Sequence, residues 1–195
     1  MRHRLVALAA LVGMLAASPT RAGHHQWDIS EAFSNASGTV QYVEMIGLGN
    51  NEQALGPWTL TSTTNTLNFV TNLPSSATLN TWVLCATSNF AGLAGGITPD
   101  YIIPANFFPT AGGTLNYATG AHIWNYGAVP TDGILALQRN GTTATNSPRN
   151  FAGASGSVDL LNGVPMIPSW GLALLVGALL LAGSGLLRKR EVMIG

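Results

Sequence analysis

Short runs of β-branched and aromatic residues, separated by Gly, Asn, Pro and Ser, constrain the fold of this chain more than any other feature. Between its two ends, no window keeps the 3.6-residue apolar spacing that an amphipathic helix requires. Short runs with recurring turn residues between them are typical of antiparallel sheets. The predicted strands are Trp27–Phe33, Thr39–Ile46, Trp58–Ser62, Leu67–Val70, Thr81–Ala86, Thr114–Tyr117, His122–Tyr126 and Ile134–Gln138.

Turn signals join these strands. Asn35-Ala36-Ser37-Gly38 predicts a hairpin turn, because Asn and Gly adopt positive φ angles readily. Gly49-Asn50-Asn51 and Arg139-Asn140-Gly141 predict two more turns. The runs Trp82–Ala86 and Ile134–Leu137 are apolar at consecutive positions, as in strands buried on both faces. We therefore predict an all-β fold, a β-sandwich of about seven to nine short strands.

The C-terminal end predicts a transmembrane helix. Trp170–Leu187 contains no charged residue, and about eighteen apolar residues are the minimum for a helix that spans a bilayer. Arg188, Lys189 and Arg190 follow directly, and each cation costs about 3 kcal/mol at mid-membrane. We expect this triplet to act as a membrane stop on the cytoplasmic side. A buried core helix fits poorly, because the segment has no polar face.

The N-terminal end predicts a secretory signal peptide over residues 1–22. Arg2 and Arg4 precede the apolar stretch Leu5–Ala17, and Thr20-Arg21-Ala22 offers a small-x-small cleavage site between Ala22 and Gly23. The alternative is an uncleaved N-terminal anchor. A signal helix at one end and a transmembrane helix at the other place the mature domain outside the cytoplasm.

The charge balance between the two ends excludes nucleic acid as a partner. The chain has eight basic and eight acidic residues, but residues 23–163 keep only Arg139 and Arg149 against seven acids. This part therefore has a net charge of −5. Nucleic-acid binding requires clustered cations that displace counterions from the phosphates.

The segment after residue 163 resembles a bacterial protein-sorting signal. It runs Val-Pro-Met-Ile-Pro-Ser-Trp-Gly, then an apolar helix, then a basic end. This layout is similar to the IPTL-CTERM and PEP-CTERM families, whose IPTL form reads Ile-Pro-Thr-Leu-Ser-Glu-Trp-Gly. The motif residues that match outright or in character are Val164, Pro165, Ile167, Trp170 and Gly171. The resemblance implies recognition by a membrane-embedded sorting protease of the exosortase type in the envelope of a Gram-negative bacterium.

Residues 27–137 resemble a lamin-tail domain. The segments that carry the resemblance are Ile29-Ser30-Glu31, Tyr42-Val43-Glu44-Met45, Leu55-Gly56-Pro57-Trp58-Thr59-Leu60, Phe69 with Leu73-Pro74, Trp82-Val83-Leu84 and Asp132-Gly133-Ile134-Leu135-Ala136-Leu137. The resemblance implies an immunoglobulin-like sandwich over residues 23–141. It also implies an adaptor or attachment module rather than an enzyme. The stretch Ser88–Gly113 is longer than the resemblance predicts.

The stretch Ser88–Gly113 holds the candidate ligand-binding residues Phe90, Tyr101, Phe107 and Phe108. A loop of this length is either functional or disordered. In one interpretation Phe90, Ile102, Phe107 and Phe108 pack as a cap on one end of the sandwich. In another the aromatics form a partly exposed surface that binds a sugar or a protein. A mobile lid is the third interpretation.

Candidate catalytic residues are few, and we predict no enzyme activity. Glu31 and Glu44 could face each other across the first hairpin, as a paired-carboxylate glycosidase centre would require. Strand alternation instead predicts that both face solvent, or that they help bind calcium with nearby Asn oxygens. His122 stands beside Trp124, where a structural histidine is expected. The sequence Gly153-Ala154-Ser155-Gly156 falls one residue short of a hydrolase nucleophile motif.

No metal or other cofactor is predicted. Cys85 is the single cysteine, so no disulfide can form within the chain, and its apolar neighbours predict a buried thiol. His24 and His25 follow the cleavage site, where a solvated tail is expected rather than a metal site. Asn35-Ala36-Ser37 and Asn140-Gly141-Thr142 match the glycosylation sequon, which we attribute to chance in a bacterial chain.

Residues 142–163 are rich in Asn, Ser, Gly and Ala and predict a flexible tether, with an edge strand near Phe151. Residues 164–195 then supply the sorting motif, the transmembrane helix and the basic stop. This layout predicts an exported, envelope-attached interaction module with an unknown surface or matrix partner. The alternatives are a carbohydrate-binding accessory module or surface hydrolase, and a matrix protein that self-assembles through sheet edges.

Overall fold

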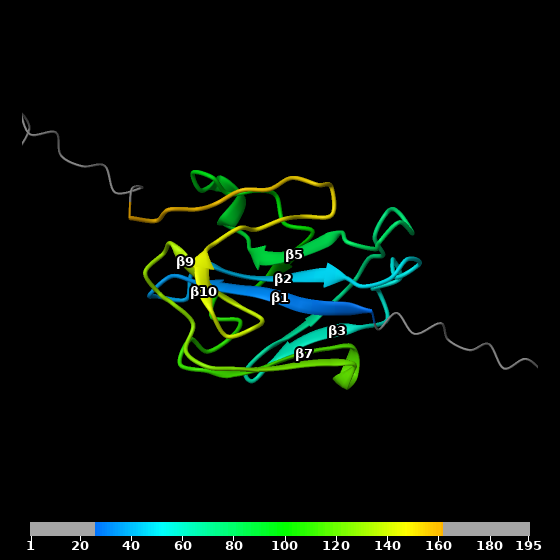
Figure 1. The fold of residues 1–195 in the computed structure, drawn as a ribbon, viewed down its shortest axis with the longest axis horizontal. Helices are drawn as coiled ribbons and strands as arrows, with labels where there is room; N and C mark the ends of the chain where they lie inside the picture. The colour runs from blue at the N-terminus through cyan, green and yellow to red at the C-terminus, as the bar shows by residue number, and fades with distance from the viewer. Residues whose placement is uncertain (1–25, 162–195) are drawn as a thin grey trace, which may run out of the picture.

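A computed structural model describes residues 26–161, and these residues form a sandwich of two β-sheets (Figure 1). The larger sheet has the strand order β10-β9-β1-β2-β5-β6, and the smaller has the order β4-β3-β7-β8. Every strand pair is antiparallel except β5 and β6, which are parallel. The predicted all-β sandwich is therefore confirmed.

Ten strands and two short 3-10 helices make up the described chain. In order they are β1 (Trp27–Ser34), β2 (Gln41–Gly47), β3 (Thr59–Ser62), β4 (Thr66–Asn68), β5 (Trp82–Thr87), η1 (Phe90–Gly92), β6 (Tyr101–Ile103), β7 (Gly113–Tyr117), η2 (Ala118–Gly120), β8 (His122–Tyr126), β9 (Leu135–Gln138) and β10 (Thr143–Thr145). All eight predicted strands are present, with ends that agree to about two residues, which is the usual uncertainty of such bounds.

The two strands that the sequence analysis missed are β6 and β10. Each is only three residues long, too short to show an alternating pattern. All three residues of β10 are exposed, so no apolar position signals a strand there. The edge strand predicted near Phe151 is wrong, because β10 occupies that role at Thr143–Thr145.

The inner face of the larger sheet packs against the smaller sheet. Alternate residues of the central strands point into this core, among them Ile29 of β1, Met45 of β2 and Val83 of β5, all fully buried. The smaller sheet contributes Leu60, Leu115 and Tyr117. This apolar layer is the principal core of the domain.

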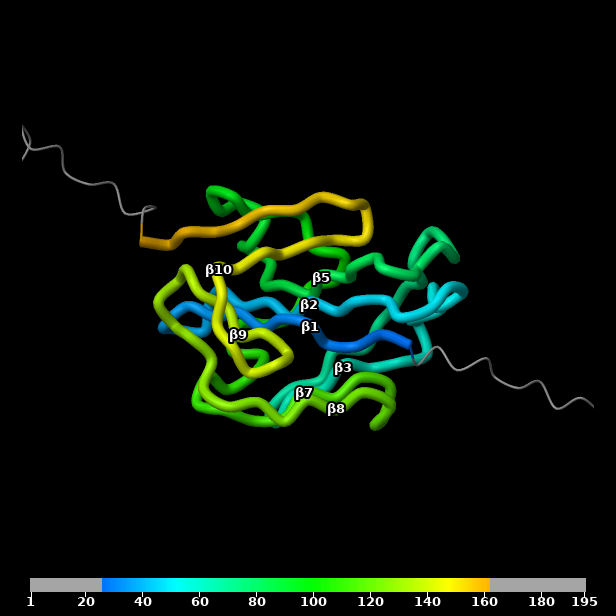
Figure 2. Tube along the Cα trace, in the orientation of Figure 1, coloured from blue at the N-terminus to red at the C-terminus, as the bar shows by residue number. Residues whose placement is uncertain are grey.

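The outer face of the larger sheet is also covered. A second buried cluster there joins Phe33, Tyr42, Leu84, Phe90 and Val158, which come from three strands, η1 and the C-terminal segment. Figures 1 and 2 show this segment, yellow to orange, on the opposite side of the larger sheet from β3 and β7. We call residues 146–160 the strap.

The strap differs from the flexible tether that was predicted for residues 142–163, of which the structure describes those up to residue 161. Val158 is fully buried, and Asn146, which is 1% exposed, hydrogen-bonds to the backbone of both Ile134 and Val158. Further along, the amide of Leu160 donates to the carbonyl of Gly133 at 3.1 Å. The Asn and Ser residues that suggested a tether are here used for hydrogen bonding to the sandwich, a role that composition alone does not reveal.

The β1–β2 hairpin turn is formed as predicted. The amide of Asn35 donates to the carbonyl of Val40 at 3.0 Å, and Gly38 has a φ of +69°. A Cβ at Gly38 would collide with the side chain of Asn106. Glycine is therefore needed there both for the turn and for the close approach of the 104–112 loop.

Candidate functional site

Glu31 and Glu44 are the most unusual residues of the described chain, because both carboxylates are buried. Their exposed fractions are 1% and 0%. The prediction that both face solvent is therefore wrong. The two residues are direct cross-strand partners on β1 and β2, and both lie on the outer face, which the strap covers. Alternation along β2 places Glu44 there, whereas alternation from Ile29 would turn Glu31 inward.

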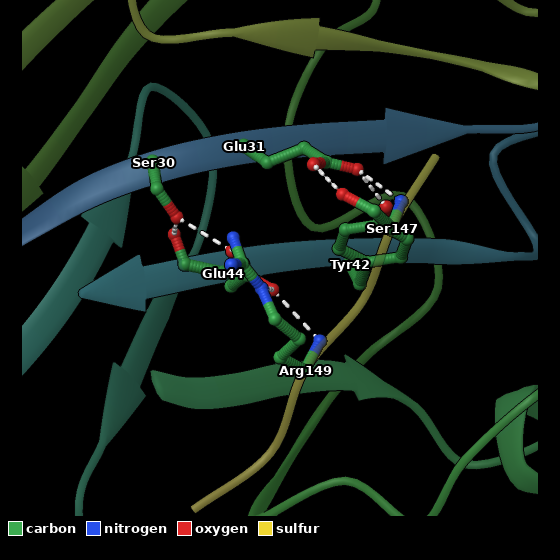
Figure 3. A network of polar contacts seen from close by, with 6 residues as sticks. All are labelled: Ser30, Glu31, Tyr42, Glu44, Ser147 and Arg149. Atoms are coloured by element: carbon green, nitrogen blue, oxygen red, sulfur yellow. Dashed lines mark hydrogen bonds and ion pairs between the residues drawn. The ribbon is translucent and has the colours of Figure 1, made fainter. Parts of the chain in front are cut away.

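A β-bulge at Ser30 sets the direction of these side chains. The β1–β2 register shifts between Ile29 and Glu31, so one extra residue of β1 lies opposite β2. A bulge of this kind re-aims neighbouring side chains. Ser30 consequently lies beside Glu44, and its hydroxyl donates to Glu44 Oε1 at 2.9 Å (Figure 3).

Three carboxylates hold the backbone of the strap. The amide of Ser147 donates to Glu31 Oε1 at 2.9 Å, and that of Arg149 donates to Glu44 Oε2 at 2.7 Å. The amide of Phe151 donates to Asp100 Oδ2 at 3.0 Å. Alternate amides of an extended segment point to the same side, so the three bonds repeat every second residue. We call Glu31, Glu44 and Asp100 the carboxylate ladder.

Side chains of the strap strengthen the first two of these contacts (Figure 3). The Ser147 hydroxyl donates to Glu31 Oε2 at 3.0 Å. The Arg149 guanidinium donates to Glu44 Oε1 from its NH2 nitrogen at 2.9 Å, and it stacks over the Trp82 ring at 4.0 Å from the centroid. The Tyr42 hydroxyl donates to Glu31 Oε1. Charge-assisted bonds such as these are stronger than neutral ones.

Burial makes it costly to keep the carboxyl groups of the ladder ionised. It raises the pKa of Glu44, against the opposing effect of Arg149 and Ser30. Burial also raises the pKa of Asp100, although the amides of Leu84 and Phe151 counteract it. The pKa of Tyr42 lies well above its ordinary value, first because of burial and then because of Glu31. Among these carboxylates, the Arg149 guanidinium contacts that of Glu44.

This arrangement leaves little room for catalysis or metal binding at Glu31 and Glu44. A general acid or base must reach substrate or water, whereas both carboxylates here are covered and accept hydrogen bonds from the strap. The calcium role suggested by the sequence is also not supported, since the carboxylate oxygens bond Ser147, Arg149, Tyr42 and Ser30. Within residues 26–161, no three His, Cys, Asp or Glu residues could hold a metal ion.

The four predicted ligand-binding aromatics are buried rather than displayed. Phe90 and Phe107 are fully buried, Phe108 is 1% exposed and Tyr101 is 7% exposed. Phe90 packs in the outer cluster, whereas the other three belong to the inner core. The exposed aromatic surface is therefore not present. Phe90, Phe107 and Phe108 are buried, as the cap interpretation required, but they lie in two different layers rather than in one cap, and Ile102 is exposed.

A cavity of about 410 Å³ lies beside the β1–β2 hairpin turn. No charged residue lines it. Phe108 and Pro109 supply apolar surface, and the polar side chains are those of Ser37, Gln41, Thr64, Asn106 and Thr110. Gln41 is fully buried, and its amide donates to the carbonyl of Phe108 at 2.9 Å.

His122 takes part in a surface ion cluster, which agrees with the structural role predicted for it. Its Nδ1 lies 3.5 Å from Asp28 Oδ1, and the Arg139 guanidinium lies 3.4 Å from the same oxygen. Arg139 also donates to the carbonyl of Ile123 at 2.9 Å and stacks near the Trp124 ring. Arg139 thus links the two sheets where the edge of β1 is left uncovered by β9.

Cys85 is a buried free thiol, as predicted, and burial raises its pKa well above the ordinary value.

The Gly153-Ala154-Ser155-Gly156 sequence forms a turn of the strap, where Arg149 and Ser155 form an isolated bridge.

The predicted targeting residues lie outside the described residues. These are the cleavage site Ala22–Gly23, the neighbouring His24 and His25, the motif Val164–Gly171 and the stop Arg188–Arg190. Within residues 26–161, no helix has the length and apolar character that a membrane crossing requires.

The sequence analysis did not find Ser147 and Arg149 as partners of the two glutamates, nor Asp100 as the third carboxylate that holds the strap. One signal was present: residues 23–163 contain only two cations, so a buried acid there had few possible partners. Comparison with known proteins adds no assignment, since no family model, no curated protein and no solved structure matches the chain.

Proposed function

We propose that the protein is an exported, non-catalytic attachment or interaction module of the cell envelope, carried by its C-terminal sorting and anchor segment. The observation that supports this best is the use of the buried carboxylates. Glu31 and Glu44 tie the strap to the sandwich instead of facing a substrate. They reinforce the segment through which an anchor would hold the domain.

The positions of the two ends of the described chain suit a domain that a C-terminal anchor holds at a surface. The described chain begins at one end of the sandwich and leaves at the other (Figure 2). The loops after β2 and before β5 lie at the end where β1 begins, because the amide of Leu48 donates to the carbonyl of Gln26 and that of Asn80 to Gly47. An anchor after residue 163 would therefore leave this end pointing away from the membrane.

That distal end carries apolar surface suited to contact with another protein. Leu48 is 50% exposed and Leu79 is 47% exposed, and the amide of Leu79 donates to Asn50 Oδ1 at 3.2 Å. Both side chains are thereby available to a partner at this end of the sandwich. The lamin-tail resemblance and its immunoglobulin-like sandwich support the same type of module, since that family serves mostly in attachment.

Carbohydrate binding is the second candidate, and the uncharged cavity beside the β1–β2 hairpin favours it. An apolar floor with several neutral donors and acceptors suits a sugar ring. Saturation-transfer NMR with neutral oligosaccharides would detect such binding, and Asn106→Ala should weaken it. Absence of transfer from the protein to maltohexaose, cellohexaose and chitohexaose would argue against this candidate.

Intact mass measurement tests the main proposal. The protein would be isolated from its native host, separately from membrane and culture medium. We expect a species that begins at Gly23 and ends within Val164–Trp170, with or without an added group. A species that runs to Gly195 in the inner membrane would refute sorting, and one that retains residues 1–22 in the cytoplasm would refute export.

A further inference from the structure

The cavity beside the β1–β2 hairpin turn lies at the end of the sandwich where the described chain ends. The amide of Leu160 donates to the carbonyl of Gly133, and the next residue back, Asp132, forms a bridge with Asn35 of the turn. Ala36 follows Asn35 and lines the cavity. Figure 1 shows the orange end of the strap and the turn between β1 and β2 on the same side of the molecule. Because bridged residues lie about 5 Å apart, the path from Leu160 to Ala36 is no longer than about 20 Å.

The chain that follows Leu160 is long enough to reach this cavity. An extended chain advances about 3.3 Å per residue, so Pro165 can lie about 17 Å from Leu160 and Pro168 about 26 Å from it. Residues 164–168 lie outside the described residues, and the cavity is within their reach. Its volume of about 410 Å³ falls in the range of about 300–1,000 Å³ that is usual for ligand sites.

The sequence of this segment suits recognition in an extended form. Residues 164–168 read Val-Pro-Met-Ile-Pro, so two prolines enclose two apolar residues. Pro-x-x-Pro sequences favour the polyproline II conformation, which leaves the backbone carbonyls without internal hydrogen bonds. Grooves with aromatic surface bind such segments at a low entropic cost, because the conformation is formed before binding. Residues 162–170 contain no charged residue, so a binding site for them needs no counter-charge.

The cavity offers surface of matching chemistry. Phe108, Pro109 and Ala111 supply its apolar part, and no charged residue of the described chain lines it. Two donors are also available there. Within residues 26–161, the side-chain amide of Asn106 and the hydroxyl of Thr110 make no hydrogen bond. Both groups can therefore donate to the free carbonyls of an extended, proline-containing peptide.

We propose that this cavity holds residues 164–168 of the same chain, so that the sandwich binds its own sorting motif. The bound motif is then withheld from a sorting protease until the segment leaves the cavity. This consequence rests on the proposed function, whereas the contact itself does not. A bound segment also excludes the oligosaccharide that is the second candidate for the same cavity.

Disulfide formation between introduced cysteines tests the contact in the full chain, purified in detergent micelles. The natural thiol of Cys85 is buried and does not compete. Ala111→Cys places a thiol on the lining of the cavity, and Met166→Cys places one between the two prolines. In mild oxidant, we expect this pair to form its disulfide about tenfold faster than a control pair, because binding raises the effective concentration of the two thiols.

Ala94→Cys with Met166→Cys is the matched control. Ala94 is exposed like Ala111, and its neighbour Gly95 accepts the amide of Ser157 at 3.1 Å. The control thiol is therefore also close to the end of the strap but does not line the cavity. Equal rates for the two pairs would overturn the proposal. Equal rates together with saturation transfer to an oligosaccharide would also overturn it and would assign the cavity to a sugar.

The role of the prolines is tested by Pro165→Ser with Pro168→Ser, added to each cysteine pair. This change keeps the segment uncharged but removes its preference for polyproline II, so the rate at Ala111→Cys should fall to that at Ala94→Cys. A ratio that stays near tenfold would refute recognition through the prolines.

A second measurement needs no introduced cysteine. In the wild-type full chain with labelled methyl groups, we expect a nuclear Overhauser effect between the methyl groups of Met166 and Ala111. The buried Met45 is the internal control, since its methyl group must show such effects with its core neighbours. Signals from Met45 without any from Met166 to Ala111 would contradict the proposal. Both experiments use purified protein, so their failure leaves the proposed export and sorting untouched.

Discussion

The two faces of the larger sheet are buried by different kinds of contact. The inner face is apolar, and residues such as Ile29, Met45 and Val83 pack against the smaller sheet. The outer face combines an apolar cluster around Tyr42 with the carboxylate ladder and its hydrogen bonds to the strap. The inner face depends on shape and area, whereas the outer face depends on matched polar partners.

The difference separates stability from selectivity. An apolar layer accepts many side chains of suitable volume, but a buried carboxylate requires a specific donor. The inner face therefore stabilises the fold through the apolar area that it buries. The outer face decides which segment of chain can lie on it.

Met45→Ala, on the inner face of the larger sheet, should give the largest loss in the free energy of unfolding. Met45 is fully buried in the inner core, and truncation of such a side chain costs about 2–5 kcal/mol. Urea unfolding of the full chain would measure the loss. Its neighbour Glu44→Gln is the matched outer-face variant and should cost less, because it opens no cavity and its cost is limited to the bonds from Ser30 and Arg149 that an amide nitrogen cannot accept. An equal loss from both variants would remove the distinction between the two faces.

Asn146→Ala should be the most damaging single change on the outer side. Its amide nitrogen donates to the carbonyls of Ile134 and Val158, and its oxygen accepts the amide of Val158. Loss of these buried bonds costs about 1–3 kcal/mol. Asn125→Ala, an exposed position with one hydrogen bond to Thr114, is the control. Equal stability of the two variants in urea would show that the strap contributes little.

High pH should weaken the inner face through its tyrosines. Burial raises the pKa of Tyr101 and that of Tyr126 from 10.0 to about 12. The folded state holds these protons more tightly than the unfolded state, so stability falls as pH rises from 10 to about 12. Tyr126→Phe should reduce this slope in chemical denaturation measured across that range. A stability that does not change up to pH 12 would contradict the burial of these hydroxyls.

Mild acid should raise the free energy of unfolding rather than release the strap from the outer face. Burial raises the pKa of Glu44 above 4.5 and that of Asp100 above 3.8. A raised pKa means that the folded state binds the proton more tightly, so this contribution to stability is complete below the ordinary pKa and is lost as pH rises through the raised one. Glu44→Gln combined with Asp100→Asn should flatten stability between acidic and neutral pH. An unchanged slope in the double variant would assign the pH dependence to other groups.

Loss of the surface charge contacts around Asp28 should give the smallest change in the free energy of unfolding. Asp28→Asn removes a carboxylate that lies 3.4 Å from Arg139 and 3.5 Å from His122, at a partly exposed site. Such pairs contribute about 0.2–1 kcal/mol and are screened by salt. The difference from wild type should therefore shrink in 1 M NaCl. A loss as large as that of Asn146→Ala would mean that charge pairs on the exposed surface matter as much as those under the strap.

The same contrast explains what the sequence could predict. Alternation along the start of β1 and along Val43–Met45 of β2 reveals which residues face inward. The strand β5 is apolar at consecutive positions and gives no such signal. Alternation also places Glu44 on the other face, whereas Glu31 reaches that face because of the bulge at Ser30. It cannot reveal that a segment 105 residues beyond Glu44 covers them, since the strap is polar, irregular and lacks a periodic pattern. Phe107 and Phe108 illustrate the opposite case, because aromatic residues in a long loop gave no indication of which layer they enter.

Hydrogen exchange at the amides of Ser147, Arg149 and Phe151 tests the central claim most directly. If the carboxylate ladder holds the strap, these amides exchange as slowly as that of Met45 in the inner core, and Glu44→Gln accelerates exchange at Arg149 more than at Met45. Exchange of all three amides at the rate of Gly141 in the exposed turn would contradict the account, because the strap would then rest on the sheet without being held by it.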